Sequence, residues 1–255
     1  MTFCLGMRVQ DGLVGIADTR VTSGSECITA RKVSIYQGKD WSVFTMTSGL
    51  RSVRDKVRTY FDEFMGDGEE MRYDRIFKVV NLFADQVRRV SKEDKESLHD
   101  SGLTFNMHAL VGGQLSGDAE HKLYMIYPEG NWVDVGEGSP YQIIGASGYG
   151  KPVLDRTLKF TDSIAFALKV GTLAFDSTRI SAADVDLPVD AVLYKKGSYH
   201  MISQRFEKRD LMEISEWWQD QLRNSVHELS LTWAESLLAK LPATETFLSL
   251  SNKKS

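Results

Sequence analysis

Strand-like and helix-like patterns occur in separate blocks along this chain, and this order constrains the fold more than any other feature. Four strands, two helices, four strands, two helices, two strands and a C-terminal helix are expected in turn. Alternating βαβ units would give a parallel sheet, whereas such blocks favour antiparallel sheets with segregated helices. The sequence therefore predicts an α+β fold in which helices cover the outer faces of two stacked antiparallel sheets.

The individual elements follow from periodicity and turn residues. Alternating patterns and short apolar runs between turn residues predict strands, and apolar residues recurring every three or four positions predict helices. The expected strands span 2–8, 12–18, 32–36, 41–47, 105–111, 122–127, 132–135, 142–144, 189–194 and 199–203. The expected helices span 50–64, 73–90, 151–158, 163–175 and 211–241, and the charged stretch 91–101 is expected to be a solvated loop.

The composition argues against several classes of protein and of binding site. The 255 residues are 42% hydrophobic and carry a formal net charge of -4, so they can bury a large core but offer no bulk attraction for nucleic acid. No apolar run is long enough for a membrane span, and the N-terminus lacks the pattern of a secretory signal. Two cysteines and five histidines show no metal-ligand spacing, so we expect a cytoplasmic protein without a metal or cofactor.

The residue after Met1 is a candidate nucleophile. Thr2 is small enough for ordinary methionine removal to expose it, with no propeptide required. An N-terminal threonine carries a hydroxyl and an α-amino group on one residue, and the amine, with a pKa of about 8, can accept the hydroxyl proton. Any chain can begin Met-Thr, so this feature needs support from elsewhere. Cys4, on the same strand, is better explained as a core residue.

Downstream motifs supply that support. In chain order they are Asp-Thr-Arg-Val-Thr-Ser-Gly from Asp18, Lys32-Val33, Thr47-Ser48-Gly49 before the first helix, and Gly145-Ala146-Ser147-Gly148 before a later helix. Over about residues 2–205, this series resembles the proteasome β-subunit family of N-terminal nucleophile hydrolases. The Met-Thr start, the TSGLR run, the Asp176-Ser177-Thr178 run and the Trp-bearing tail are most similar to its bacterial ancestral β-subunit branch, Anbu.

The resemblance implies a four-layer αββα sandwich and a threonine-type hydrolase. Lys32 would be the catalytic lysine, Asp18 would orient it, and together they would ease deprotonation of the Thr2 hydroxyl. Adjacent Arg31 is a rival cation, and a plain surface salt bridge would also explain an Asp18–Lys32 pair.

The resemblance also assigns residues around the substrate. The backbone N–H of Ser48 would stabilise the oxyanion, with Gly49 beside it in the substrate site, although helix capping explains this pair equally well. Thr22 matches a residue that lines the cleft and binds peptide as an added strand.

Ser147 and Asp176 match the serine and aspartate that hydrogen-bond the threonine amine in the family. The family has a further serine where this chain has Arg179, so one of the two intervening hydroxyl residues would substitute, or the support would be incomplete.

The sequence thus predicts a proteasome-type peptidase or amidase over residues 2–205, with a C-terminal helical extension over 206–255. Its expected partners are copies of itself, in a ring, lock-washer or open helical particle, and a peptide or protein substrate. No nucleic acid or membrane is expected. Two alternatives stay open: a catalytically weak or silent scaffold on the same fold, and a narrow-specificity amidase or acylase.

Overall fold

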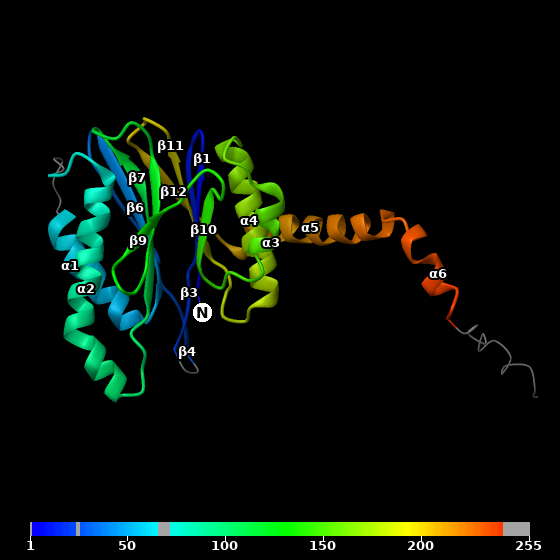
Figure 1. The fold of residues 1–255 in the computed structure, drawn as a ribbon, viewed down its shortest axis with the longest axis horizontal. Helices are drawn as coiled ribbons and strands as arrows, with labels where there is room; N and C mark the ends of the chain where they lie inside the picture. The colour runs from blue at the N-terminus through cyan, green and yellow to red at the C-terminus, as the bar shows by residue number, and fades with distance from the viewer. Residues whose placement is uncertain (1, 24–25, 66–71, 242–255) are drawn as a thin grey trace, which may run out of the picture. The chain divides into compact units, whose positions relative to one another are not determined.

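The computed structural model of the protein describes residues 2–23, 26–65 and 72–241. The chain falls into two units, residues 1–215 and 216–255. The first unit holds two five-stranded antiparallel sheets, with helices α1 and α2 on the outer side of one and α3 and α4 on the outer side of the other (Figure 1). The predicted α+β fold, a four-layer αββα sandwich, is therefore confirmed.

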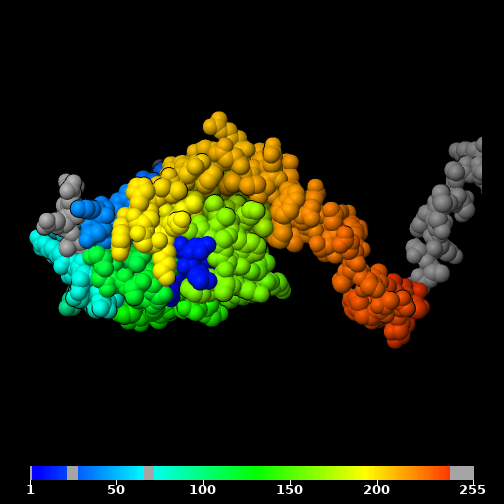
Figure 2. All heavy atoms as spheres, turned by 90° about the horizontal axis from the view of Figure 1, so that it is seen from above, coloured from blue at the N-terminus to red at the C-terminus, as the bar shows by residue number. Residues whose placement is uncertain are grey.

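The first sheet is built around the N-terminal hairpin. Its strand order is β10-β1-β2-β11-β12. The bounds are β1 Phe3–Val9, β2 Gly12–Asp18, β10 Tyr141–Gly145, β11 Val189–Lys195 and β12 Met201–Phe206. Figure 2 shows the blue β1–β2 turn at the surface beside the yellow β11–β12 turn, where the Lys196 N–H donates to the Asp11 carbonyl oxygen at 2.9 Å. Thr2 lies at the opposite end of β1.

The second sheet has its strands in the order β5-β6-β7-β8-β9. The bounds are β5 Val33–Gln37, β6 Trp41–Gly49, β7 Met107–Leu115, β8 Lys122–Ile126 and β9 Trp132–Asp134. A separate two-stranded hairpin, β3 Arg20–Ser23 and β4 Glu26–Thr29, connects the first sheet to the second. This hairpin was not predicted, because the alternation in so short a segment is masked by its polar residues.

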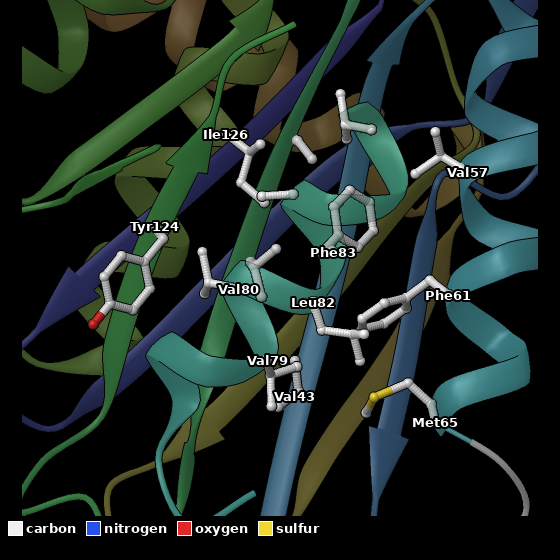
Figure 3. Packing of buried hydrophobic residues seen from close by; sticks show 14 of the residues in the cluster. Val43, Val57, Phe61, Met65, Val79, Val80, Leu82, Phe83, Tyr124 and Ile126 are labelled. Carbon is white, nitrogen blue, oxygen red and sulfur yellow. The ribbon is translucent and has the colours of Figure 1, made fainter. Parts of the chain in front are cut away.

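Three apolar clusters separate the four layers. One lies between the second sheet and helices α1 (Arg51–Met65) and α2 (Ile76–Asp100); Figure 3 shows Val57 and Phe61 of α1 beside Phe83 of α2. Another lies between the first sheet and helices α3 (Lys151–Thr157) and α4 (Ile164–Ser181). The third lies between the sheets. Successive side chains of β1 belong to two different clusters: Phe3 and Leu5 face the helices, and Cys4 faces the other sheet.

The expectation of a loop over 91–101 is wrong. Helix α2 continues to Asp100 because its charges pair with a neighbouring helix and along its own turns. The Lys56 ammonium of α1 lies 2.8 Å from Glu93 and 2.7 Å from Asp94, and Arg89 lies 3.1 Å from Glu93, four residues on. A charged segment with such spacing is a solvated helical face.

The expectation of one long C-terminal helix is also wrong. Helix α5 spans Lys208–Glu228, and a short 3₁₀ turn, Thr232–Ala234, precedes α6, Glu235–Leu238. The hydroxyl of Ser230 accepts a hydrogen bond from the Thr232 N–H at 3.4 Å, an arrangement that competes with helical backbone bonding. None of the described helices has the length and apolar character needed to cross a membrane.

Candidate active site

Thr2 is buried at the start of β1 and lines a pocket of about 580 Å³. Ser48, Gly49, Arg51 and Arg54 are among the other residues around this cavity, which we call the Thr2 pocket. The residues expected to hold the oxyanion therefore lie around the same cavity as the expected nucleophile.

A glycine allows β10 to come close to Thr2. Gly145 has a φ of +91°, and a Cβ at this position would lie 1.8 Å from the Thr2 carbonyl oxygen. The same carbonyl oxygen accepts a hydrogen bond from the Ala146 N–H at 2.7 Å. Only glycine fits here without moving the backbone, and the contact fixes the backbone of Thr2 at the pocket.

Asp18 and Lys32 form a buried ion pair next to Thr2. The Lys32 ammonium lies 2.6 Å from Asp18 Oδ1, and the two side chains are 1% and 0% exposed. Asp18 Oδ1 also accepts the Phe3 N–H at 2.8 Å, so the pair is attached to the residue that follows Thr2. Burial raises the pKa of Asp18, and the Lys32 charge opposes that effect. This is a desolvated pair and not a surface salt bridge.

The Lys32 ammonium keeps donor capacity. It has three hydrogens. Among the described residues it donates to Asp18 and to the Arg20 carbonyl oxygen, the latter also at 2.6 Å. The rival cation is placed elsewhere: Arg31 is largely exposed, with its guanidinium 3.9 Å from Asp190. Of the two cations, Lys32 is the one that pairs with Asp18.

Asp176 is engaged in a different network. It is buried on α4, where Arg179 lies 2.7 Å from Oδ1 and the Ser215 hydroxyl donates to Oδ2 at 3.1 Å. Arg179 also donates to the Ser215 hydroxyl at 3.1 Å. The hydroxyl that contacts Asp176 is thus that of Ser215 on α5, 39 residues along the chain from Asp176.

The other residues singled out in the sequence are Ser147, Thr22 and Cys4. Ser147 is exposed in the turn before α3, where its carbonyl oxygen accepts the Lys151 N–H at 3.2 Å. Thr22 belongs to β3, but its side chain lies outside the described residues, as does Met1. Cys4 is fully buried, and burial raises the pKa of its thiol to about 12, which makes it a core residue without nucleophilic character at neutral pH.

Two residues that line the Thr2 pocket or contact Asp176 were not predicted from the sequence. Arg54 lines the Thr2 pocket although it is only 7% exposed, and its signal was a charge placed directly beside the apolar stripe of α1. Ser215 had no local signal, since its partners lie on another helix. No group of three or more potential metal ligands occurs within the part of the chain that the structure describes.

Anbu proteins are among the solved structures that are similar to this chain. The helical assembly of the Anbu complex from Pseudomonas aeruginosa aligns with a TM-score of 0.84 and 26% identity over 96% of this chain and 100% of the other. Anbu (ancestral beta-subunit) from Yersinia bercovieri gives 0.82 and 27%, over 89% and 98%.

A third similar structure is the Anbu (Gly-1) mutant from Hyphomicrobium sp. strain MC1, with a TM-score of 0.82 and 26% identity over 90% and 98% of the two chains. No model of a known sequence family and no curated protein sequence matches the chain. The likeness is therefore carried by the whole αββα sandwich, and the structure matches the Anbu ancestral β-subunits of the proteasome type.

Proposed function

We propose that this protein is a threonine-type N-terminal nucleophile hydrolase that cleaves peptide or amide bonds with Thr2 after Met1 is removed. The observation that carries the proposal is the buried Asp18–Lys32 pair, joined through the Phe3 N–H to the residue that follows Thr2. A desolvated cation held beside a hydroxyl favours the alkoxide over the neutral form.

The reaction follows from these groups. The Thr2 hydroxyl attacks the substrate carbonyl carbon while the freed α-amine takes its proton, and Lys32 stabilises the developing charge on Oγ. A backbone N–H of the Ser48–Gly49 segment, which lines the Thr2 pocket, stabilises the oxyanion of the tetrahedral intermediate. Collapse of this intermediate breaks the C–N bond, and the leaving amine takes the proton. Water then hydrolyses the threonyl ester by the same steps.

The direct test is the Thr2→Ala variant. Removal of the nucleophile is expected to lower kcat/KM for a fluorogenic peptide at least about a thousandfold. Thr104→Ala is the matched control, because Thr104 lines the same pocket but is exposed; it should keep its rate within a few-fold. Hydrolysis that persists in Thr2→Ala would refute the proposal.

Mass determination gives an independent test. The mature chain is expected to lack Met1, and a β-lactone should add its mass at Thr2 in the wild type and not in Thr2→Ala. A retained Met1 together with absent labelling would favour the second candidate, a catalytically silent scaffold. One observation favours that alternative: the carboxylate of Asp176 is occupied by Arg179 and Ser215.

We also propose that the protein assembles with copies of itself. The Pseudomonas aeruginosa relative is a helical assembly. In this chain, residues 216–241 expose several large apolar side chains, which favours an interaction role: Trp217, Leu222, Val226, Leu229 and Trp233. Light scattering at increasing concentration should give a mass above that of one chain, and replacement of Trp233 by Glu should reduce it. A monomer at every concentration would refute self-assembly.

A further inference from the structure

Arg54 is a buried cation whose hydrogen-bonding capacity is incompletely used. Its side chain lies on α1 and is 7% exposed, and it donates to the Thr47 carbonyl oxygen over a long 3.4 Å contact. Its Nε has no partner among the described residues. A guanidinium does not lose its charge in proteins, so a buried one without a carboxylate is costly unless an anion comes to it.

The Arg54 side chain also lines a second cavity. It has a volume of about 200 Å³ and is lined by Arg31, Arg51, Arg54 and Arg58 together with Lys32 and Asp55, and we call it the arginine pocket. The carboxylates of this region are already used: Asp55 lies 3.3 Å from Arg51, and Asp18 pairs with Lys32. Arg54 and Arg58 have no carboxylate partner within the described residues. The pocket therefore carries an excess of positive charge.

The arginine pocket adjoins the predicted site of bond cleavage. Arg51 and Arg54 line both it and the Thr2 pocket. Lys32, which lines the arginine pocket, is joined through Asp18 to the Phe3 N–H. A substrate whose carbonyl carbon lies at Thr2 can thus place a neighbouring side chain against Arg54.

We propose that the arginine pocket binds a substrate carboxylate, so that the hydrolase favours peptides with Glu or Asp on the acyl side of the cleaved bond. This inference rests on the proposed function. A carboxylate fits the planar guanidinium with two parallel hydrogen bonds, and the pocket has room for a short side chain. The carboxylate is that of the acidic acyl-side side chain.

The test uses two fluorogenic peptides that differ only by Glu or Gln at the acyl-side residue. The wild type should cleave the Glu peptide roughly 10- to 100-fold faster in kcat/KM, the range expected for a charge-assisted hydrogen bond. Arg54→Met should bring the ratio of the Glu-peptide rate to the Gln-peptide rate to about one, and Arg54→Lys should keep part of the preference. Equal wild-type rates for the two peptides would overturn the inference.

Two further variants test the inference in case Arg54→Met does not fold. Arg58→Glu changes an exposed side chain at the rim of the pocket and should lower the Glu preference several-fold. Arg209→Met is the matched control, since its side chain is 87% exposed on α5, and it should keep the wild-type preference. An unchanged preference in both Arg54→Met and Arg58→Glu would overturn the inference.

Calorimetry on Thr2→Ala separates this inference from the proposed function, because this variant still has the arginine pocket. Peptides ending in Glu or Gln, each as a free acid and as an amide, distinguish the side-chain carboxylate from the terminal one. Tighter binding of the Glu peptides than of the Gln peptides, lost on adding Arg54→Met, supports the inference even if the wild type hydrolyses nothing. Equal binding of the Glu and Gln peptides, or a preference for the free acid over the amide alone, overturns it even if Thr2 proves to be the nucleophile.

Discussion

Two buried aspartates, Asp18 and Asp176, match site positions of the same family pattern, yet the fold gives them different partners. Asp18 ends β2, and its Oδ1 contacts Lys32 and the Phe3 N–H. Asp176 lies within α4, and its oxygens contact Arg179 and Ser215. A carboxylate on a motif therefore acquires its role from the element packed against it.

The two carboxylates also differ in their partners and in how far water reaches those partners. Asp18 has one ion-pair partner with no access to water, and its Oδ2 has no partner among the described residues. The Arg179 side chain that faces Asp176 is 22% exposed, so that network is partly solvated. Loss of a partner should therefore cost more at Asp18 than at Asp176.

The largest effect is expected for Lys32→Met. This change leaves the Asp18 carboxylate buried without a counter-charge and should lower the free energy of unfolding by about 3–5 kcal/mol. It should also remove hydrolysis, since the cation that Asp18 holds next to the residue after Thr2 is lost. Urea denaturation and a peptide assay on the folded fraction measure the two effects.

The double variant Asp18→Asn/Lys32→Met is the control for this experiment. It removes both charges together and should recover much of the lost stability without recovering activity. A double variant that is less stable than Lys32→Met would show that the pair is not coupled in the way described.

A smaller effect is expected for Arg179→Met. Asp176 keeps its hydrogen bond from Ser215 and some access to water, so the free energy of unfolding should fall by about 1–3 kcal/mol. Hydrolysis per folded molecule should stay near the wild-type value, because this network occupies α4 and α5. A large loss of kcat in a folded Arg179→Met protein would instead support the predicted role of Asp176 beside the Thr2 amine.

Ser215→Ala refines this second measurement. It removes one hydroxyl from the network, and the expected loss is about 1 kcal/mol. A loss in Ser215→Ala as large as that in Arg179→Met would mean that attachment of α5, and not the ion pair, accounts for the stability.

The smallest expected effect is a pH dependence of stability that comes from His121 and from neither aspartate. His121 is 1% exposed, its Nε2–H donates to the Val9 carbonyl oxygen at 2.8 Å, and burial lowers its pKa. The unfolded chain therefore takes up a proton at higher pH than the folded one. The resulting stability is complete above the unfolded pKa of about 6.5 and is lost as the pH falls below it.

Urea midpoints between about pH 7.5 and 5.5 measure this dependence. His121→Gln should reduce the loss of stability toward low pH, and the same reduction should occur when it is combined with Lys32→Met or with Arg179→Met. An identical pH profile in the wild type and His121→Gln would contradict the assignment.

Most of the sandwich was predictable because its signals are local. The hairpin over residues 2–18 and the apolar stripes of the first helices follow from periodicity alone. The stretch 91–101 was not predictable in this way. Its charges suit a loop or a helix equally, and the contacts of Lys56 with Glu93 and Asp94 select the helix.

The candidate site was likewise predictable only where its signals are local in the sequence. The motifs around Asp18, Lys32 and Ser48 were visible in the chain because each lies next to a strand end or helix start. Arg54 fits an ordinary amphipathic helix in the sequence, since nothing nearby along the chain reveals that its Nε is buried without a partner among the described residues.

Periodicity and turn chemistry act over a few residues, so the order of elements, the layers they form and the motif residues that meet at the end of β1 can be predicted from the chain alone. The charge pairs could not be predicted in this way: Lys32, and not Arg31, pairs with Asp18, Asp176 pairs with Arg179 and Ser215, and four arginines surround one cavity. Burial and charge pairing depend on groups distant in sequence, such as Asp176 and Ser215, which are 39 residues apart.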